Sequence, residues 1–257
     1  MSSMTKTSTS LKTVKIDTTG IYYRDLNIRL RQLADDGVER IELENVCGQR
    51  YIATDLSRPM SFKITGTPGN DLGAFMNGSR IEVFGNAQDC MANTMNAGEI
   101  IIHGHAGDIC GMAARGGKIF IRDYVGYRAG IHMKEYEDKK PVLVIGDTGQ
   151  DFLGEYMAGG VLAVLGLGLK EGEKHKANFI GTGIHAGVIY ISGEFEPYQL
   201  GKEVGVAELD DHDREVLSGL VTEYCGHFGG GADKIMQRPF KKLYPKFLRP
   251  YGRMYAY

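Results

Sequence analysis

Short apolar runs recur at a nearly constant spacing over the central part of the chain. The runs begin at Ile64, Ile81, Ile100, Ile119, Val142, Val161 and Val188, so that successive starts lie 17, 19, 19, 23, 19 and 27 residues apart. A period of about 19 residues, lengthened where residues are inserted, is typical of a solenoid in which each repeat forms one turn. A single turn cannot bury its own apolar side, so neighbouring turns must stack.

Glycines repeat with the apolar runs and predict the corners of each turn. The offsets of 3, 7 and 12 residues are the same after Gly66 (Gly69, Gly73, Gly78) and after Gly104 (Gly107, Gly111, Gly116). Glycine adopts positive φ angles without a Cβ clash. Apolar strands separated by glycine corners predict a mainly β fold, a parallel β-helix over residues 61–205 with about 19 residues per turn and six to seven turns.

Alternate residues of each strand are expected to point into the helix. Two columns should then stack along the axis: Ile81, Ile100, Ile119, Val142 and Val161, and beside them Val83, Ile102, Ile121, Val144 and Ala163. Each such side chain contributes about 1.5–3 kcal/mol once it is buried. Charged insertions at residues 133–141 and 169–178 lengthen two turns and are the natural places for contacts with a partner.

The flanks predict a cap for the first end of the β-helix and, after it, a helix that lies along the coil or closes its far end. Residues 13–60 should form a small α+β cap, with a helix over residues 23–36, strands at 15–17 and 39–43, and residues 51–53 pairing with the second strand. Residues 206–257 should hold an amphipathic helix over 210–228 and an aromatic tail that docks on this chain or on a partner. The Ser/Thr-rich residues 1–12 are expected to be a disordered tail.

Composition narrows the class of protein. Thirty-six glycines among 257 residues suit a fold with many corners, and the net charge of −2 gives no electrostatic case for nucleic acid or an anionic membrane. The four cysteines (Cys47, Cys90, Cys110, Cys225) form no CxxC motif, which suits free thiols in a reducing compartment such as the cytoplasm. No apolar run approaches the roughly 20 residues of a membrane span.

Several residue groups are candidates for chemistry. Residues 181–187 (GTGIHAG) resemble a dinucleotide fingerprint, but a strand-like run follows where a helix is needed, which favours a corner. His103 and His105 could bind a metal ion with Asp108 or His132, or they could be solvated. Cys90 and Cys110 lie one turn apart, as buried stacked thiols or as a redox pair.

Other polar residues fall near the predicted corners. Aspartates that accept local backbone N–H bonds are expected at Asp71, Asp89, Asp108, Asp123, Asp147 and Asp151. Asn70, Asn86, Asn93 and Asn96 are candidates for a stacked ladder. Arg115, Arg122 and Arg128 could bind a phosphate group of a partner or be solvated. No nucleophile with a base emerges, so we assign no catalytic, cofactor-binding or metal-ligating residue to this chain.

Four glycine-rich segments carry a resemblance to a known family. Residues 66–73 (GTPGNDLG), 85–89 (GNAQD), 126–133 (GYRAGIHM) and 154–160 (GEYMAGG) resemble the GXGXG domain, the C-terminal β-helix of the glutamate synthase large subunit. Residues 44–50 and 249–255 resemble stand-alone subunits of that group. The chain is also similar to the β-helical subunit of formylmethanofuran dehydrogenase. The resemblance implies a right-handed parallel β-helix in a subunit that supports others.

In glutamate synthases, other domains carry the chemistry. The resemblance therefore implies partner subunits: an amidotransferase with an N-terminal cysteine, and a synthase with FMN and iron–sulfur clusters. Here Ser2 follows Met1, and there is no cysteine cluster for an iron–sulfur centre. We interpret the chain as a non-catalytic scaffold of a glutamate-synthase-type complex that converts glutamine and 2-oxoglutarate to glutamate. The chain could itself form a homo-oligomer.

Three alternatives remain open at this point. The chain could be the scaffold of a molybdenum or tungsten formylmethanofuran dehydrogenase, or part of a related N-methylglutamate synthase. It could also be a β-helical enzyme with its own site, such as a hexapeptide acyltransferase. The period of 19 is not a multiple of six, which counts against the acyltransferase.

Overall fold

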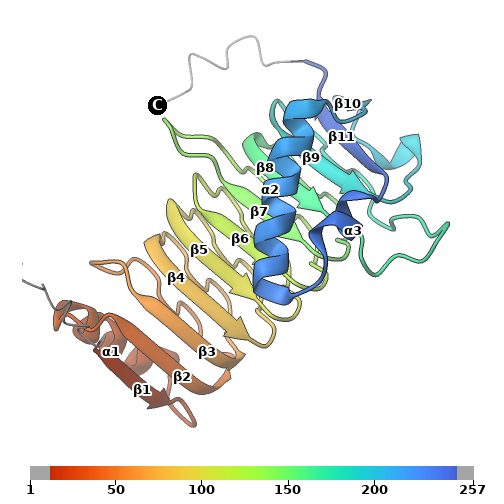
Figure 1. The fold of residues 1–257 in the computed structure, drawn as a ribbon. Coiled ribbons are helices and arrows are strands. Elements are labelled where there is room, and N and C mark those ends of the chain that lie inside the picture. Colours follow the sequence, from red (N-terminus) through yellow and green to blue (C-terminus); the bar gives the residue numbers. More distant parts are fainter. Residues whose placement is uncertain (1–11, 248–257) are drawn as a thin grey trace, which may run out of the picture.

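The strands of the protein follow one another along a coil (Figure 1). The computed structural model describes residues 12–247. Strands β1 to β9 pair in parallel in chain order, and β11 and β10 extend the sheet in antiparallel pairing. The elements are β1 (Thr13–Asp17), α1 (Tyr23–Asp35), β2 (Arg40–Cys47), β3 (Ser61–Thr67), β4 (Asn77–Phe84), β5 (Ala97–Ile102), β6 (Lys118–Ile121), β7 (Val142–Ile145), β8 (Ala158–Val164), β9 (Ala186–Ser192), a 3-10 helix (Pro197–Gln199), β10 (Val204–Ala207), α2 (Asp211–Phe228), α3 (Ala232–Met236) and β11 (Phe240–Pro245). The predicted parallel β-solenoid is confirmed.

Two apolar columns fill the interior of the solenoid. Each column takes one residue from each strand β4 to β9, and every member is at most 2% exposed. The first column is Ile81, Ile100, Ile119, Leu143, Leu162 and Ile189, and the second is Val83, Ile102, Ile121, Ile145, Val164 and Ile191. Because these side chains pack turn upon turn, the core is continuous along the coil.

The predicted columns were right for three strands and wrong for the next two. Val142 and Val144 on β7, and Val161 and Ala163 on β8, face outward, in register with Lys118 and Phe120 of β6. A slip of one residue moves every side chain to the other face of a strand. Strands β7 and β8 are apolar on both faces, so alternation along their sequences could not reveal the register.

Helix α2 explains why these strands are apolar outside as well as inside. It lies across the outer face of the later strands (Figure 1), where Leu217, Leu220, Val221 and Tyr224 pack in one cluster with outward residues of β6 to β9. The Asp210 carboxylate accepts a 2.8 Å bond from the Asp213 N–H and the Asp213 carboxylate accepts one from the Asp210 N–H, a reciprocal cap. Gly229, with φ of 82°, ends the helix, as predicted.

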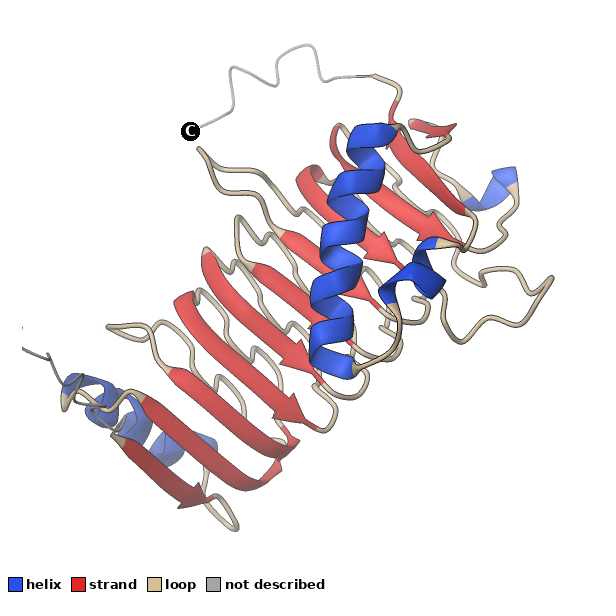
Figure 2. Ribbon diagram, viewed as in Figure 1, coloured by secondary structure: helices blue, strands red, loops and turns tan. Residues whose placement is uncertain are grey.

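The N-terminal unit continues the same sheet. Helix α1 buries Leu26 and Leu30 against the end of the solenoid, and Gly37 follows it with φ of 77°. Residues 51–53, which we expected to pair as a strand, instead form a turn with positive φ at Tyr51 and Ala53. They are the first of the repeated corners described below. Figure 2 shows that helices flank the coil at this end and on one outer face.

Part of the aromatic tail docks on this chain. Residues Phe240–Pro245 form β11, which pairs with β9 on one side and β10 on the other. The rest of the predicted docking tail, residues 248–257, and most of the predicted disordered N-terminal tail, residues 1–11, lie outside the described residues. Between residues 12 and 247, no helix is both long enough and apolar enough to cross a membrane.

Candidate functional site

One corner of the solenoid repeats an unusual backbone conformation at every turn. Three residues, spaced two apart, have positive φ angles near 60°. The first position is held by Tyr51, Asp71, Cys90, Ile109, Arg128, Phe152 and Phe179, the second by Ala53, Gly73, Ala92, Gly111, Gly130, Gly154 and Gly181, and the third by Asp55, Phe75, Thr94, Ala113, His132, Tyr156 and Gly183. Non-glycine residues rarely adopt this region, so the stacked turns must hold it in place.

Hydrogen bonds in two directions along the axis hold this corner. The N–H of Arg128, at the first position, donates to Asp151 O of the following turn at 2.9 Å. The N–H of Gly130, at the second position, donates to Cys110 O of the preceding turn at 2.8 Å. Only small residues fit the second position, because a Cβ on Gly73 would lie 2.8 Å from the buried Ile100 side chain. The first and third positions therefore present their side chains outward.

The outward side chains of neighbouring turns stack on one another. Phe152 and Phe179 lie with ring centroids 4.9 Å apart, and His132 and Tyr156 with centroids 5.3 Å apart. The Arg128 guanidinium covers the Phe152 ring at 4.3 Å and forms an ion pair with Glu155. We call the outward residues Phe75, Ile109, Arg128, His132, Phe152, Tyr156 and Phe179 the corner surface. Such aromatic and arginine side chains are enriched in protein interfaces.

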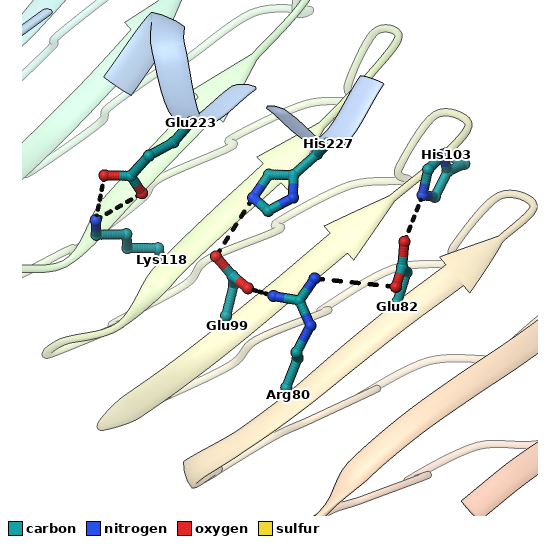
Figure 3. A network of polar contacts seen from close by, with 7 residues as sticks. All are labelled: Arg80, Glu82, Glu99, His103, Lys118, Glu223 and His227. Atoms are coloured by element: carbon teal, nitrogen blue, oxygen red, sulfur yellow. Dashed lines mark hydrogen bonds and ion pairs between the residues drawn. The ribbon is translucent and has the colours of Figure 1, made fainter. Parts of the chain in front are cut away.

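A second polar constellation lies where the end of α2 meets the outer face of the sheet (Figure 3). Arg80 forms ion pairs with Glu82 and Glu99, which lie on neighbouring strands. His103 lies 3.0 Å from Glu82, and His227 of α2 lies 3.4 Å from Glu99. Outward residues are charged on β4, whereas they are mostly apolar from β6 onward under α2. The network marks this boundary.

The ion pairs and ring contacts of this polar network attach the end of α2 to the sheet. Lys118 bridges both oxygens of Glu223 at 2.6 Å, which ties α2 to β6. Burial holds the pKa of His227 below its usual value, and the nearby Arg80 guanidinium lowers it further. His103 is stacked on Phe84 at 4.5 Å and touches Phe228 edge-on. These pairs anchor the end of α2, and each histidine already has a carboxylate neighbour.

A cavity of about 490 Å³ opens at the same end of α2. It is lined by Arg122, Leu167, Tyr224, Phe228, Gly229, Gly230, Gly231, Lys234, Ile235 and Arg238. The Tyr224 hydroxyl group donates a 2.9 Å bond to Arg122 O, and burial raises the pKa of Tyr224. Sequence reasoning identified neither this cavity nor the corner surface. The glycines of the second corner position repeat visibly in the sequence. The residues of the corner surface lie two positions before and two positions after them, so this spacing could have been used to find the surface.

The histidines predicted as a metal pair diverge. His103 stacks toward the preceding turn, on Phe84, whereas His105 stacks on Tyr124 of the following turn at 4.7 Å. His132 stacks on Tyr156. Among residues 12–247, no three His, Cys, Asp or Glu side chains gather as a possible metal site.

Residues 181–187 form a corner followed directly by β9, with Gly181 and Gly183 at positive φ. The interpretation as a corner is confirmed, because β9, and not a helix that could hold a pyrophosphate group, follows these glycines.

The two cysteines Cys90 and Cys110 are not stacked thiols. Cys90 occupies the first corner position, the same as Ile109, whereas Cys110 points into the core and is fully buried. All four cysteines are free.

Four of the six corner aspartates accept backbone N–H bonds from a neighbouring turn, whereas we expected local backbone bonds. Asp123 instead pairs with the adjacent Arg122, and Asp71 accepts a bond from the Asn93 side chain. Asp89 accepts from the Asp108 N–H and Asp108 from the Tyr127 N–H, both at 2.9 Å. Asp147 and Asp151 likewise accept backbone N–H bonds from residues more than twenty positions further along the chain. Each of these four carboxylates thus links two turns by a bond from a backbone N–H to a side chain.

Two of the predicted asparagines, Asn86 and Asn93, bond to other residues and not to one another. Asn86 accepts from the His105 N–H at 3.1 Å, and Asn93 donates to Asp71. The three arginines also separate: Arg122 forms a bidentate pair with Asp123, Arg128 belongs to the corner surface, and Arg115 is exposed. They form no joint phosphate site.

Comparison with known proteins now adds the family. The sequence model of the GXGXG motif matches residues 38–251. The chain belongs to the GXGXG motif family. An uncharacterized protein of Methanocaldococcus jannaschii is 48% identical over 254 residues, covering 96% of this chain and 97% of that protein. That match includes both flanks as well as the solenoid.

Membership of the GXGXG family confirms the resemblance seen in the four glycine-rich segments. It relates the chain to a domain of the glutamate synthase kind. The structure explains two of the repeated glycines in the matched range: a Cβ on Gly107 would lie 2.2 Å from Asp89 Oδ1, and one on Gly126 would lie 2.0 Å from Asp108 Oδ1. These glycines therefore leave room for the carboxylates that join the turns.

Proposed function

We propose that this GXGXG protein is a non-catalytic scaffold subunit of a glutamate-synthase-type complex in the cytoplasm. It would hold an amidotransferase-like subunit and a synthase subunit, and it could itself form a homo-oligomer. FMN and iron–sulfur clusters would be carried by the partners, with none in this chain. Ammonia released from glutamine could then reach the synthase without escaping.

The corner surface is the observation that carries this proposal. It presents Phe179 and Phe75 with about half of their surface exposed, 49% and 50%, in positions fixed by the ladder of backbone bonds. The corner surface runs over six consecutive turns, which at about 4.8 Å per turn make a strip of roughly 24 Å. A rigid surface of this length suits a partner that must be held at a set distance, because little conformational entropy is lost on binding.

Affinity purification of the tagged full chain from an extract of the source organism tests the proposal. We expect an amidotransferase-like chain and a flavin/iron–sulfur chain to co-purify. Activity of the recovered complex with ammonia or methylamine would distinguish glutamate synthesis from N-methylglutamate synthesis. Recovery of molybdopterin subunits would overturn the proposal in favour of a formylmethanofuran dehydrogenase. Turnover of a substrate by the chain alone would overturn the scaffold role.

Two substitutions connect the proposal to the corner surface. Phe179→Asp and Tyr156→Asn remove the aromatic rings and keep residues that adopt positive φ readily, so the corner is preserved. Together they should abolish or strongly reduce co-purification. Tyr198→Asp is the matched control, because Tyr198 is 76% exposed and lies outside the corner surface. Equal recovery of the partners with the double variant and the control would contradict the role of this surface.

A further inference from the structure

Arg238 is a charged side chain fixed in place without an acidic partner. Its Nη2 donates a 2.7 Å bond to Gly166 O, and its Nε donates a 3.1 Å bond to the hydroxyl group of the buried Ser192. Among the described residues, no carboxylate lies within ion-pair distance of Arg238. Both bonds lead to neutral oxygen atoms, so the positive charge is positioned but not neutralised.

Two more cations line the same cavity at the end of α2. Lys234, in α3, is exposed and forms no ion pair within residues 12–247. Arg122 is paired with Asp123 through two bonds of 2.9 and 3.1 Å. The wall of the cavity therefore carries an excess of positive charge from Lys234 and Arg238, in a chain whose overall net charge is −2.

Arg238 also lines a second cavity, and carboxylates lie there. That cavity is lined in part by Glu171 and Glu173 of the inserted segment and by Glu194, which follows β9. The Glu173 carboxylate accepts a bond from the Lys170 N–H at 3.2 Å. Within residues 12–247 none of these glutamates forms an ion pair with Arg238, so its charge remains available to a ligand in the cavity at the end of α2.

The rest of the wall is apolar and aromatic. Tyr224 and Ile235 are 3% and 8% exposed, and Phe228 and Leu167 complete the lining. The Tyr224 ring is held by its bond to Arg122 O and lies edge-on to Phe228 at 4.8 Å. A volume of about 490 Å³ is within the range of small-molecule sites, which combine apolar walls with a few polar groups.

We propose that this cavity binds a small organic anion in which a carboxylate or phosphate group is joined to an aromatic or apolar body. The acidic group would pair with Lys234 and with the free face of the Arg238 guanidinium. The body would lie against Tyr224, Phe228 and Leu167. This site shares no residue with the corner surface, so it stands or falls independently of the scaffold role.

Isothermal titration of the full chain with four probes tests the proposal. Phenyl phosphate and benzoate supply the two acidic groups on a ring, inorganic phosphate supplies the charge alone, and phenol supplies the ring alone. We expect phenyl phosphate or benzoate to bind at least tenfold more tightly than inorganic phosphate and phenol, and to weaken as salt is added. The tighter of the two identifies the acidic group. Equal affinity for all four probes would overturn the proposal.

Variants locate the binding. Lys234→Met should weaken the tighter probe by about 3- to 10-fold because it removes the ammonium group, and Arg238→Lys should weaken it by a similar factor because lysine keeps the charge but loses the fixed guanidinium geometry. The Lys234 side chain is exposed and forms no ion pair within the described residues, so its variant remains informative if Arg238→Lys unfolds. Lys202→Met, on an exposed lysine outside this cavity, is the control. Unchanged affinity in Lys234→Met and in folded Arg238→Lys would place binding elsewhere and overturn the inference.

Discussion

The Tyr190 hydroxyl group donates a 2.8 Å hydrogen bond to Asp213, whose side chain is only 2% exposed. Tyr190 points outward from the last parallel strand, and Asp213 lies in the first turn of α2. Lys242 of β11 reaches the same carboxylate at 2.8 Å. One buried carboxylate therefore joins three elements that are distant in sequence, and fastens the start of α2 to the end of the solenoid.

Removing one donor from this junction should destabilise the protein moderately. Tyr190→Phe is expected to lower the free energy of unfolding by about 1–2 kcal/mol, because the buried carboxylate loses a hydrogen bond but keeps Lys242. Urea unfolding at pH 7, followed by circular dichroism, measures the change. Tyr198→Phe is the control, since Tyr198 is 76% exposed. Indistinguishable midpoints for the two variants would mean that the bond adds nothing.

The same junction should respond to acid. Burial raises the pKa of Asp213, but hydrogen bonds from Lys242 and Tyr190 outweigh it and hold the pKa below the ordinary value of 3.8. The stabilisation is therefore complete above that ordinary value and is lost as the pH falls through the lower folded-state pKa. Asp213→Asn should be less stable than the native chain at pH 7, and the gap should narrow below about pH 4. Unfolding free energies measured from pH 7 to pH 2 test this, and a constant gap would contradict it.

The GXGXG corners should tolerate no side chain where a carboxylate approaches. Gly126→Ala would place a Cβ 2.0 Å from Asp108 Oδ1, and we expect a loss of about 2–4 kcal/mol of stability. Gly219→Ala is the matched control, because nothing lies within 4 Å of its Cβ on the exposed side of α2. That control should stabilise the protein by up to about 1 kcal/mol, since alanine is the better helix former. Thermal and urea unfolding of both variants give the comparison.

A double-mutant cycle separates the clash from other effects of the alanine. Asp108→Ala removes the obstructing oxygen but leaves the Tyr127 N–H without its acceptor. Asp108→Ala should therefore be destabilising alone, and should relieve part of the cost of Gly126→Ala when combined with it. Strict additivity of the two substitutions would show that the close approach of carboxylate and glycine is not what the motif protects.

The sequence repeat predicted the architecture because two independent patterns, of apolar residues and of glycines, show the same period. The apolar starts and the glycine offsets both have a period of about 19 residues, and each one limits where a turn can begin. Helix α2 was predicted within one residue, since Asp210 caps it and Gly229 ends it. These signals are local, so they survive in a single sequence.

The register of β7 and β8 and the cavity at the end of α2 could not be predicted, because both depend on contacts between segments that are distant in the sequence. The outward positions of β7 and β8 are apolar because α2 covers them, and α2 comes more than forty residues later in the chain. A strand that is apolar on both faces carries no alternation from which to read its register. The cavity escaped notice for the same reason, because Arg122, Lys234 and Arg238 come together only when α2 and α3 fold back over the sheet.

His175 should make the protein sensitive to mild acid. Its side chain is 2% exposed, its Nε2 donates a 2.8 Å bond to Ser192 O, and its Nδ1 has no hydrogen-bond partner within residues 12–247. Burial holds the pKa of His175 below the ordinary value of 6.5. Below that value the imidazole of the unfolded chain takes up a proton, whereas the buried imidazole of the folded chain does so only at lower pH. The free energy of unfolding should therefore fall as the pH drops from 7 to 5.

A variant that cannot be protonated at this position tests the prediction. His175→Gln keeps a donor near Ser192 O, so its free energy of unfolding, measured at pH 5, 6 and 7, should decline less steeply than that of the native chain. Some decline should remain, because burial also lowers the pKa of His227. His212→Gln, at an exposed position, should leave the slope unchanged, and parallel curves for native chain and His175→Gln would rule out the buried imidazole as the source.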